Sequence, residues 1–152
     1  MNTPPKKELS VNAIENGTVI DHIPGEITLK VVEIVSNPDD MMTIGVNLPS
    51  RSLSKKGFVK ISNRFLTDEE TSKIALIAPM AKVNIIKNYK IVSKSIVHLP
   101  AQIKGLVKCN NPICITNKEV MVTVFDVLKP TPLKMRCHYC ERTMGSNELH
   151  LL

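Results

Sequence analysis

The sequence predicts an α+β fold in two parts: an antiparallel sheet with two helices on one face, then a small all-β domain built around four cysteines. Strand and helix patterns follow one another in the order β-α-β-β-α-β-β over the first two thirds of the chain. All four cysteines lie in the last third. A proline-containing break near residues 98–100 separates the two parts, so we expect domains at residues 1–100 and 101–152.

The first elements surround a turn signal at Asn16-Gly17, with short apolar stretches on either side at 11–14 and 18–23. Apolar residues then recur at helical spacing, which predicts a helix over 25–36. Its many β-branched residues leave a strand as the alternative. Residues 37–40 contain a proline and two aspartates and end this element.

Two alternating stretches, 42–48 and 58–63, predict strands, and the polar, basic stretch 50–57 between them predicts a flexible loop. A second helix begins at a capping box, with Thr67 as N-cap and Glu70 at the third helical position.

That helix must end near Pro79 because the residue before a proline disfavours helical backbone. Residues 81–86 and 89–97 predict two strands joined by a tight turn at 87–88. The whole order is that of a split β-α-β arrangement, so a ferredoxin-like antiparallel sheet is expected.

The cysteines form two short pairs, Cys109-x4-Cys114 and Cys137-x2-Cys140, separated by 22 residues. Four thiolates carried by two tight turns can surround a metal ion tetrahedrally, which predicts one structural Zn²⁺ per chain. The alternatives are two disulfides or four unrelated thiols of the core. Disulfides are disfavoured because no secretory signal opens the chain, and we expect a reducing, cytoplasmic location.

The segment around the cysteines is expected to be mainly strand, with one strand over 120–128, a turn at 130–132 and a strand from 133 leading to the second pair. A domain of about fifty residues buries too little apolar surface to be stable on its own, so the bound metal is expected to stabilise its fold. Four cysteines leave no ligand position for His138, and His150 has no partner at ligand spacing.

The composition is that of a globular protein with a basic balance. Hydrophobic residues make up 43%, aromatic residues only 3%, and the net charge is +6 with a pI near 9.2. No run of eighteen apolar residues occurs, so no membrane partner is expected. The positive charge suits nucleotides, nucleic acid or an acidic protein surface.

Lysines on or beside the predicted strands could hold the phosphates of a nucleoside triphosphate: Lys56, Lys60, Lys90 and Lys94. Strand alternation predicts that Lys90, Val92 and Lys94 share one face, as do Asn84 and Ile86. An apolar wall beside an amide would suit a base edge. The alternative is that these lysines only solvate the outer face of the sheet.

Several motifs follow one another in order, beginning with GTVIDHIP at 17–24 and TIGVNLPS at 43–50. The further motifs are Lys55-Lys56, Lys60-Ile61, Ala78-Pro79-Met80-Ala81, Val83-Asn84, Asn88-Tyr89 and the two cysteine pairs. Together these motifs and their spacing resemble the aspartate carbamoyltransferase regulatory chain family. The resemblance covers essentially the whole chain, from about Val11 to Cys140.

This resemblance implies a non-catalytic, allosteric subunit of the enzyme that joins carbamoyl phosphate to aspartate in pyrimidine biosynthesis. It implies that the first domain binds CTP, UTP and ATP as effectors, with a pyrimidine triphosphate as the chief inhibitor and ATP as the activator in the family, and that the zinc domain holds the catalytic chain. Which nucleotide inhibits and which activates this chain stays open. Regulatory homodimers would then bridge catalytic trimers. Carried over by position, the nucleotide contacts are Val11, Ala13, Ile14, Asp21, His22, Lys56, Lys60, Asn84, Ile86, Tyr89, Ile91 and Lys94.

Within that set, Lys60 and Lys94 would hold phosphates and ribose, and main-chain groups at Ala13, Ile14, Tyr89 and Ile91 would read the base. Asp21 would contact the sugar or, with His22 and Lys56 as weaker candidates, assist a second, metal-assisted nucleotide. For Asp21 and His22 the alternatives are a turn cap and a partly buried histidine.

Two other classes of function remain as alternatives. A zinc-ribbon nucleic-acid-binding protein would use the positive charge on phosphates, but the cysteine segment lacks interleaved aromatic residues, and we expect no nucleic-acid partner. A zinc enzyme would need an open coordination position and a carboxylate base, for which Glu119, Glu141 and Glu148 are available. Saturation by four thiolates argues against it, so no catalytic residue is predicted.

Overall fold

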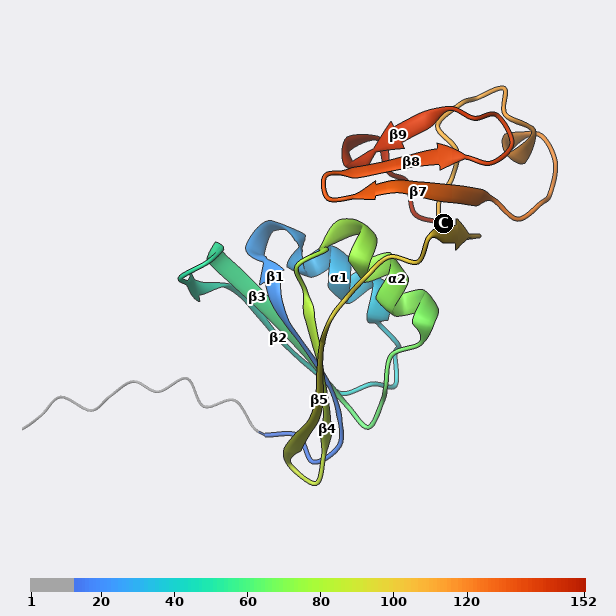
Figure 1. Ribbon diagram of the computed structural model, residues 1–152. Helices are drawn as coiled ribbons and strands as arrows, with labels where there is room; N and C mark the ends of the chain where they lie inside the picture. The colour runs from blue at the N-terminus through green and yellow to red at the C-terminus, as the bar shows by residue number, and fades with distance from the viewer. Residues whose placement is uncertain (1–12) are drawn as a thin grey trace, which may run out of the picture.

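The computed structural model describes residues 13–152 and shows two sheets with a layer of two helices between them (Figure 1). The first part contains, in chain order, β1 (Gly17–Pro24), η1 (Gly25–Ile27), α1 (Thr28–Val35), β2 (Met42–Ser50), β3 (Ser54–Ser62), α2 (Asp68–Ile77), β4 (Lys82–Lys87) and β5 (Lys90–Ile96). The second part contains β6 (Gln102–Lys104), η2 (Ile115–Asn117), β7 (Val124–Pro130), β8 (Leu133–Cys137), β9 (Thr143–Gly145) and η3 (Ser146–Glu148).

The first sheet is antiparallel throughout and has the strand order β2-β3-β1-β4-β5. The first four strands reproduce the predicted split β-α-β order, and β5 extends the sheet as a hairpin partner of β4. Both helices cover one face of this sheet (Figure 1), which confirms the predicted fold class. The second sheet has the order β6-β7-β8-β9 and is also antiparallel.

The predicted helix signals act as expected. The side chain of Thr67 accepts a hydrogen bond from the Glu70 amide, and the Glu70 carboxylate accepts one from the Thr67 amide at 2.8 Å. This capping box satisfies two of the amide groups that the first turn of a helix leaves unpaired. Helix α2 ends at Ile77, two residues before Pro79.

Two sequence-based boundaries are wrong. Residues 50–57 do not form a loop, because main-chain pairing of Pro49 with Lys55 and of Ser50 with Ser54 extends both strands into a tight hairpin. The strand expected over 120–128 begins only at Val124, as β7. The buried Thr123 just before it instead donates its hydroxyl to the Val107 carbonyl at 2.7 Å.

Each part has its own apolar core, and α2 contributes to both. Ile74 and Ala75 pack with strand residues such as Ile20 and Val59 under the first sheet. The next residue, Leu76, is 3% exposed and packs with Ile103 and the rest of the second core. Because successive residues of a helix point about 100° apart, one short helix can serve two cores.

Arg64 joins the two helices through a largely buried set of ionic contacts. Its Nε donates to Asp40 at 2.6 Å and its Nη1 donates to Glu70 at 2.7 Å. Its Nη2 donates to the carbonyl of Val35 at the end of α1, where the helix dipole favours a cation. Asp40 follows α1 and Glu70 lies in α2, so one guanidinium fixes how the helices meet.

Among residues 13–152, no helix is long and apolar enough to cross a membrane.

Candidate functional site

The outer face of the first sheet carries a row of four residues in register across four strands. Val19 of β1 pairs with Lys60 of β3 on one side and with Asn84 of β4 on the other, and Asn84 pairs with Lys94 of β5. We call Lys60, Val19, Asn84 and Lys94 the cross-sheet row. The structure therefore brings together three predicted nucleotide contacts that lie far apart in the sequence.

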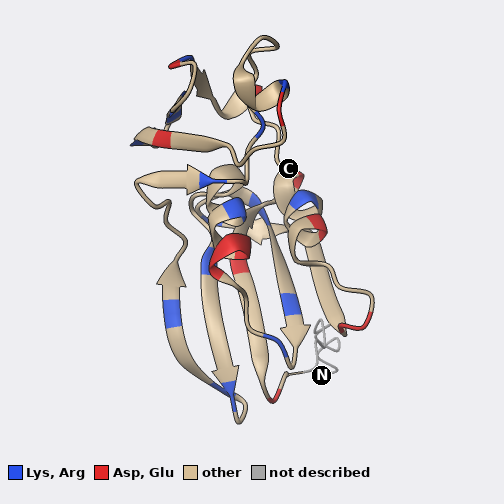
Figure 2. Ribbon diagram, turned by 90° about the vertical axis from the view of Figure 1, so that its right-hand side faces the viewer, with Lys and Arg blue, Asp and Glu red and all other residues tan. Residues whose placement is uncertain are grey.

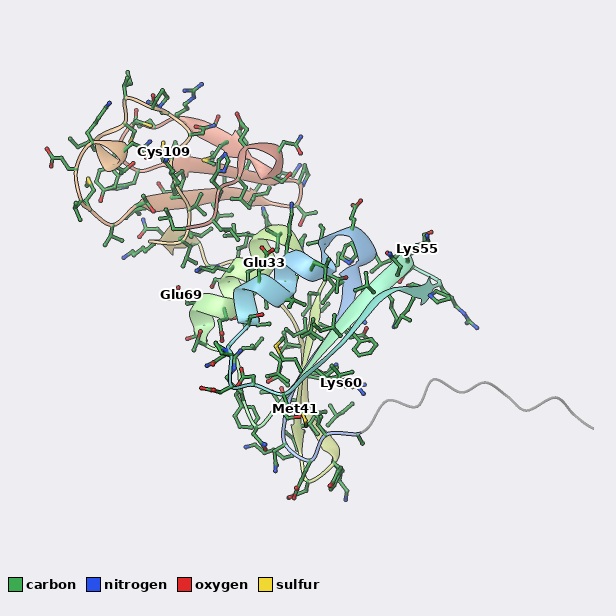
Figure 3. All side chains as sticks on the ribbon, turned by 180° about the vertical axis from the view of Figure 1, so that it is seen from behind. Glu33, Met41, Lys55, Lys60, Glu69 and Cys109 are labelled. Atoms are coloured by element: carbon green, nitrogen blue, oxygen red, sulfur yellow. The ribbon has the colours of Figure 1, made fainter. Side chains whose placement is uncertain are left out.

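The row faces away from the helices. Val59 and Ile61, the neighbours of Lys60 along β3, are fully buried in the core under the helix layer. Because side chains alternate along a strand, Lys60 points to the opposite face. Lys60 is labelled on the sheet in Figure 3, with the helices between it and the domain of Cys109. Neighbouring strands are about 4.8 Å apart, so Lys60 and Lys94 stand about 14 Å apart along the row.

Next to the row, the turn between β4 and β5 meets the start of the described chain. The amide of Tyr89 donates to the Glu15 carbonyl at 3.0 Å, and Ile86 pairs with Ile91 across the hairpin. Ala13 and Ile14 precede Glu15, so they lie beside this turn. These predicted contacts gather beside the row, toward the β4–β5 turn; Val11 lies outside the described residues.

At the other end of the face, β1 bulges against β3. Ile20 pairs with Val59 and Ile23 with Gly57, so Asp21 and His22 together stand opposite a single residue. The Asp21 carboxylate lies 3.4 Å from the Lys56 ammonium. His22 has a positive φ of 62°, and its Nε2 lies 3.3 Å from the Ser52 hydroxyl. Asp21, His22 and Lys56 thus form a second polar cluster on the sheet.

The expectation that Lys90 shares a face with Lys94 is wrong. The register of β4 and β5 shifts between Ile85 and Ile86, so Lys90 pairs with Lys87. The ammonium of Lys87 lies 5.5 Å above the Phe65 ring, on the helix side of the sheet. Simple alternation missed this shift because a bulge leaves no reliable mark in the sequence.

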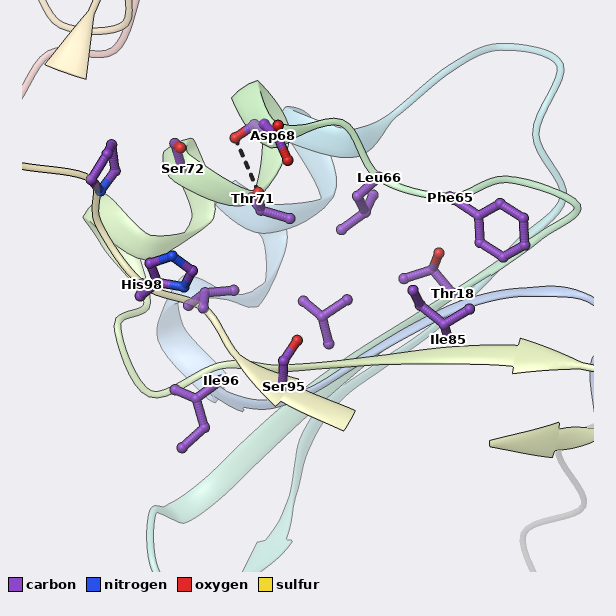
Figure 4. Close-up of a pocket in the computed structure, with 13 residues that line it drawn as sticks. Thr18, Phe65, Leu66, Asp68, Thr71, Ser72, Ile85, Ser95, Ile96 and His98 are labelled. Atoms are coloured by element: carbon purple, nitrogen blue, oxygen red, sulfur yellow. Dashed lines mark hydrogen bonds between the residues drawn. The ribbon is translucent and has the colours of Figure 1, made fainter. Parts of the chain in front are cut away.

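A groove of about 520 Å³ lies on the helix side of the sheet, between α2 and the β4–β5 hairpin (Figure 4). Its walls are mainly apolar, and Ser72 and His98 contribute polar groups. The hydroxyl of Thr71, which also lines it, is bonded to the main chain of its own helix at 3.0 Å. None of the predicted nucleotide contacts within residues 13–152 lines this groove, so it is separate from the cross-sheet row.

The four cysteine sulfurs converge in the second domain, each within 4.8 Å of the others. The Sγ atoms of Cys109 and Cys140 are 3.7 Å apart, and those of Cys114 and Cys137 are 3.8 Å apart. A disulfide needs about 2.05 Å. A tetrahedral ion with metal–sulfur bonds of about 2.3 Å places its sulfurs about 3.8 Å apart, which fits this cluster.

The thiols of the cluster differ in acidity. Burial raises the pKa of Cys109 to about 12 and also raises the pKa of Cys137. Burial alone would raise the pKa of Cys140 too, but hydrogen bonds from the Arg142 main chain and the Asn111 side chain, together with neighbouring thiols, lower it to about 7. A bound cation would stabilise all four as thiolates.

Two polar residues that the sequence analysis did not single out support the first cysteine pair. The Asn117 amide donates to the carbonyls of Cys109 at 2.9 Å and Asn111 at 2.8 Å, which closes the loop between the cysteines. The Thr116 hydroxyl donates to the Cys114 sulfur at 3.2 Å. Their position just after Cys114 is the one signal in the sequence that could have identified them.

The two histidines near the cysteines are not part of the cluster. His138 is exposed and its Nδ1 lies 4.0 Å from the Asp126 carboxylate. The carbonyl of His150 accepts a hydrogen bond from the Lys108 amide at 2.9 Å.

Comparisons with known proteins agree with this two-part architecture. Residues 9–98 match the family described as aspartate carbamoyltransferase regulatory chain, allosteric domain. Residues 101–150 match the metal binding domain of the same regulatory chain. The four-cysteine cluster therefore lies in a metal-binding domain.

Relatives match over nearly their whole lengths. The aspartate carbamoyltransferase regulatory chain of Pyrococcus horikoshii is 52% identical over 147 residues, covering 93% of this chain and 96% of the relative. Those of Pyrococcus abyssi and Bacteroides thetaiotaomicron are 50% and 45% identical, covering 93% and 97% of this chain and 96% and 97% of the relatives. Both their names and the domain descriptions denote a regulatory rather than a catalytic chain. This chain belongs to the aspartate carbamoyltransferase regulatory chain family.

Proposed function

We propose that this chain binds nucleoside triphosphates on the cross-sheet row and thereby regulates an aspartate carbamoyltransferase catalytic chain held by its metal domain. The observation that carries the proposal is the register of Lys60, Asn84 and Lys94. Two cations at the ends of the row suit phosphates and ribose hydroxyls, and an amide between them suits the polar edge of a base. CTP, UTP and ATP are the proposed effectors.

We propose that main-chain groups around the β4–β5 turn form hydrogen bonds with the base of the nucleotide. Amide and carbonyl groups at Tyr89 and Ile91, with Ala13 and Ile14 beside them, offer donors and acceptors beside the row. Ile86 is apolar, lies in the same place and is largely buried, at 7% exposed. This combination supports discrimination between pyrimidine and purine rings.

The cluster of Asp21, His22 and Lys56 is a proposed second nucleotide position. Asp21 could hold a divalent ion bound to the phosphates, because a carboxylate oxygen is a ligand that Mg²⁺ prefers. The contact between Asp21 and Lys56 at 3.4 Å is partly exposed, so either group can exchange its partner for a ligand.

Zinc is the proposed metal, one ion per chain, bound by Cys109, Cys114, Cys137 and Cys140. Four thiolates at tetrahedral spacing are the typical ligand set of a structural Zn²⁺. A closed site of this kind stabilises folding and leaves no position for a catalytic water.

The proposed contact with the catalytic chain lies on the segment between the cysteine pairs. Large aliphatic side chains are exposed there: Ile113, Ile115, Val120 and Val122. Such residues in one surface segment are typical of a protein interface. Residues 1–100 are the proposed effector-binding unit, and residues 101–152 are the proposed unit that contacts the catalytic chain.

Two regulatory chains are proposed to meet through their sheet domains and to bridge catalytic trimers. Strands β2 and β5 are the two edges of the first sheet, and every residue of β5 is exposed. An edge strand offers unpaired main-chain groups to a second copy.

The test uses the chain alone and in complex with its catalytic chain, with calorimetric titrations of CTP, UTP and ATP and with zinc measured on the same samples. We expect micromolar nucleotide binding, about one zinc per chain and co-elution that depends on zinc. Lys60→Gln should weaken nucleotide binding, whereas Lys104→Gln, an exposed lysine of the metal domain, should not. Salt-dependent nucleic-acid binding without nucleotide binding would contradict the proposal.

A further inference from the structure

Phe58 occupies the outer face of β3 between two of the proposed phosphate-binding lysines. It lies two residues from Lys56 and two from Lys60, so all three share one face of the strand. It pairs with Gly45 of β2, and the bulge formed by Asp21 and His22 of β1 stands opposite its other side. A half-buried aromatic ring therefore sits at the meeting point of the cross-sheet row and the second polar cluster.

Gly45 leaves the space that this ring fills. A Cβ atom at position 45 would lie 2.3 Å from Cε1 of Phe58 and 2.8 Å from Cδ1. The ring therefore covers the backbone of Gly45, and this contact limits where it can move. Packing of this kind holds an aromatic side chain in one position on an otherwise open sheet face.

The ring in turn holds the ammonium group of Lys60. The Nζ atom lies 5.7 Å from the centroid of Phe58, within the range of a cation–π contact. Lys56 is held differently, because it forms an ion pair with Asp21 at 3.4 Å. Among residues 13–152, Lys60 forms no ion pair with a carboxylate. Its charge is therefore held in place by a neutral ring and is not cancelled.

We propose that Phe58, seated on Gly45, is a positioning residue that fixes the Lys60 ammonium for the phosphate groups of a nucleoside triphosphate. This inference rests on the proposed function. An ammonium has three donors, so one side can face the ring while the others contact phosphate oxygens. A lysine that is already oriented loses less side-chain freedom on binding, and this strengthens the contact with the ligand.

The experiment is a double-mutant cycle on the full chain in complex with its catalytic chain, with CTP and cytidine as probes. Phe58→Leu should weaken CTP binding about two- to fivefold, as the loss of an exposed cation–π contact predicts. In a Lys60→Gln background the same change should have no further effect. Cytidine, which carries no phosphate, should bind equally well to both forms, and Phe58→Tyr should retain the affinity for CTP.

Phe65→Leu is the matched control, because Phe65 holds Lys87 at 5.5 Å on the helix side of the sheet. It removes the same kind of contact and should leave CTP binding unchanged. Gly45→Ala provides a second variant, since it displaces the ring without removing it and should also weaken CTP binding.

Three results would overturn the inference. They are unchanged CTP affinity in Phe58→Leu, an equal loss in the Lys60→Gln background, or an equal loss for cytidine. In each case the wild-type complex still binds CTP and the proposed function stands. A wild-type complex that binds no CTP would instead overturn the proposed function and the inference together.

Discussion

Each of the four cysteine sulfurs has a different environment, yet they lie at the spacing of one tetrahedral ion. The separations of 3.7 and 3.8 Å are too long for disulfides and match two edges of a metal–thiolate tetrahedron. Burial raises the pKa of Cys109 and of Cys137, so without a cation the thiolates of these two residues would be costly. The metal therefore acts at the scale of single residues as a cross-link between two turns.

Cys114→Ser should abolish metal binding and unfold the second domain, because the remaining three thiols cannot close the tetrahedron. Metal content by mass spectrometry and thermal unfolding measure both effects. Thr116→Val serves as the milder comparison. It removes the hydroxyl that donates to the Cys114 sulfur and should weaken metal binding about tenfold while leaving the domain folded. A folded, metal-loaded Cys114→Ser protein would show that the cluster is not a four-cysteine site.

At the scale of elements, Arg64 determines how α1 and α2 sit on the sheet. Its guanidinium contacts Asp40, Glu70 and the end of α1, and the side chains of all three charged residues are at most 21% exposed. Removing one partner of such a set leaves charges that neither water nor protein fully compensates.

Arg64→Met should lower the free energy of unfolding by about 3 kcal/mol, because Asp40 and Glu70 lose their shared partner. Arg51→Met, at an exposed arginine in the β2–β3 turn, should change it by less than about 0.5 kcal/mol. Urea unfolding of the two variants beside wild type measures the difference. Equal stability of all three proteins would mean that the ionic set contributes nothing net.

The elements themselves could largely be predicted from the sequence, because their signals are local. The capping box at Thr67 and Glu70 and the β4–β5 turn depend on residues within a few positions of each other. The bulge at Asp21-His22 and the extension of the β2–β3 hairpin depend on pairing with other strands. Polar residues such as Ser54 and Lys55 carry no strand signal of their own, so this part of the fold could not be predicted.

The residues of the candidate site also differ in whether the sequence alone predicts them. Cysteine spacing alone predicted which sulfurs meet, because few arrangements of two short pairs satisfy a metal. The sequence identifies lysines that could bind phosphate. Only the strand register shows that Lys94 lies in the same row as Lys60 and that Lys90 does not. The contributions of Phe58 and Asn117 could not be predicted, because each depends on a partner whose position the fold determines.

At the scale of the whole molecule, α2 is the physical link between the two domains. Ala75 packs under the first sheet while Leu76 packs in the metal domain. Figure 1 shows α2 between the first sheet and the second domain. The Lys73 ammonium of the same helix also lies 3.2 Å from the main-chain oxygen of Leu152. Figure 2 marks both basic and acidic residues along the ribbons of the two helices. A shift of the sheet on nucleotide binding would therefore reach the metal domain through this helix.

Leu76→Ala should destabilise the chain by about 3 kcal/mol, because it leaves a cavity in the core of the metal domain. Leu76→Met conserves volume and should cost less than about 1.5 kcal/mol. Since neither change touches the cross-sheet row, nucleotide affinity of the isolated chain should stay at the wild-type value while coupling to the catalytic chain weakens. Wild-type coupling in Leu76→Ala would rule out this helix as the link.

We propose that nucleotides act on the catalytic chain through the cross-sheet row. The most direct test measures how the reaction rate of the reconstituted enzyme depends on aspartate concentration, with and without CTP or ATP, using wild-type or Lys60→Gln regulatory chains. We expect each nucleotide to shift the half-saturating aspartate concentration with wild-type chains, by a coupling of about 1–3 kcal/mol. With Lys60→Gln chains of equal zinc content and assembly, the same nucleotide concentration should give a smaller shift. An unchanged shift with Lys60→Gln would show that the nucleotides do not act through the cross-sheet row.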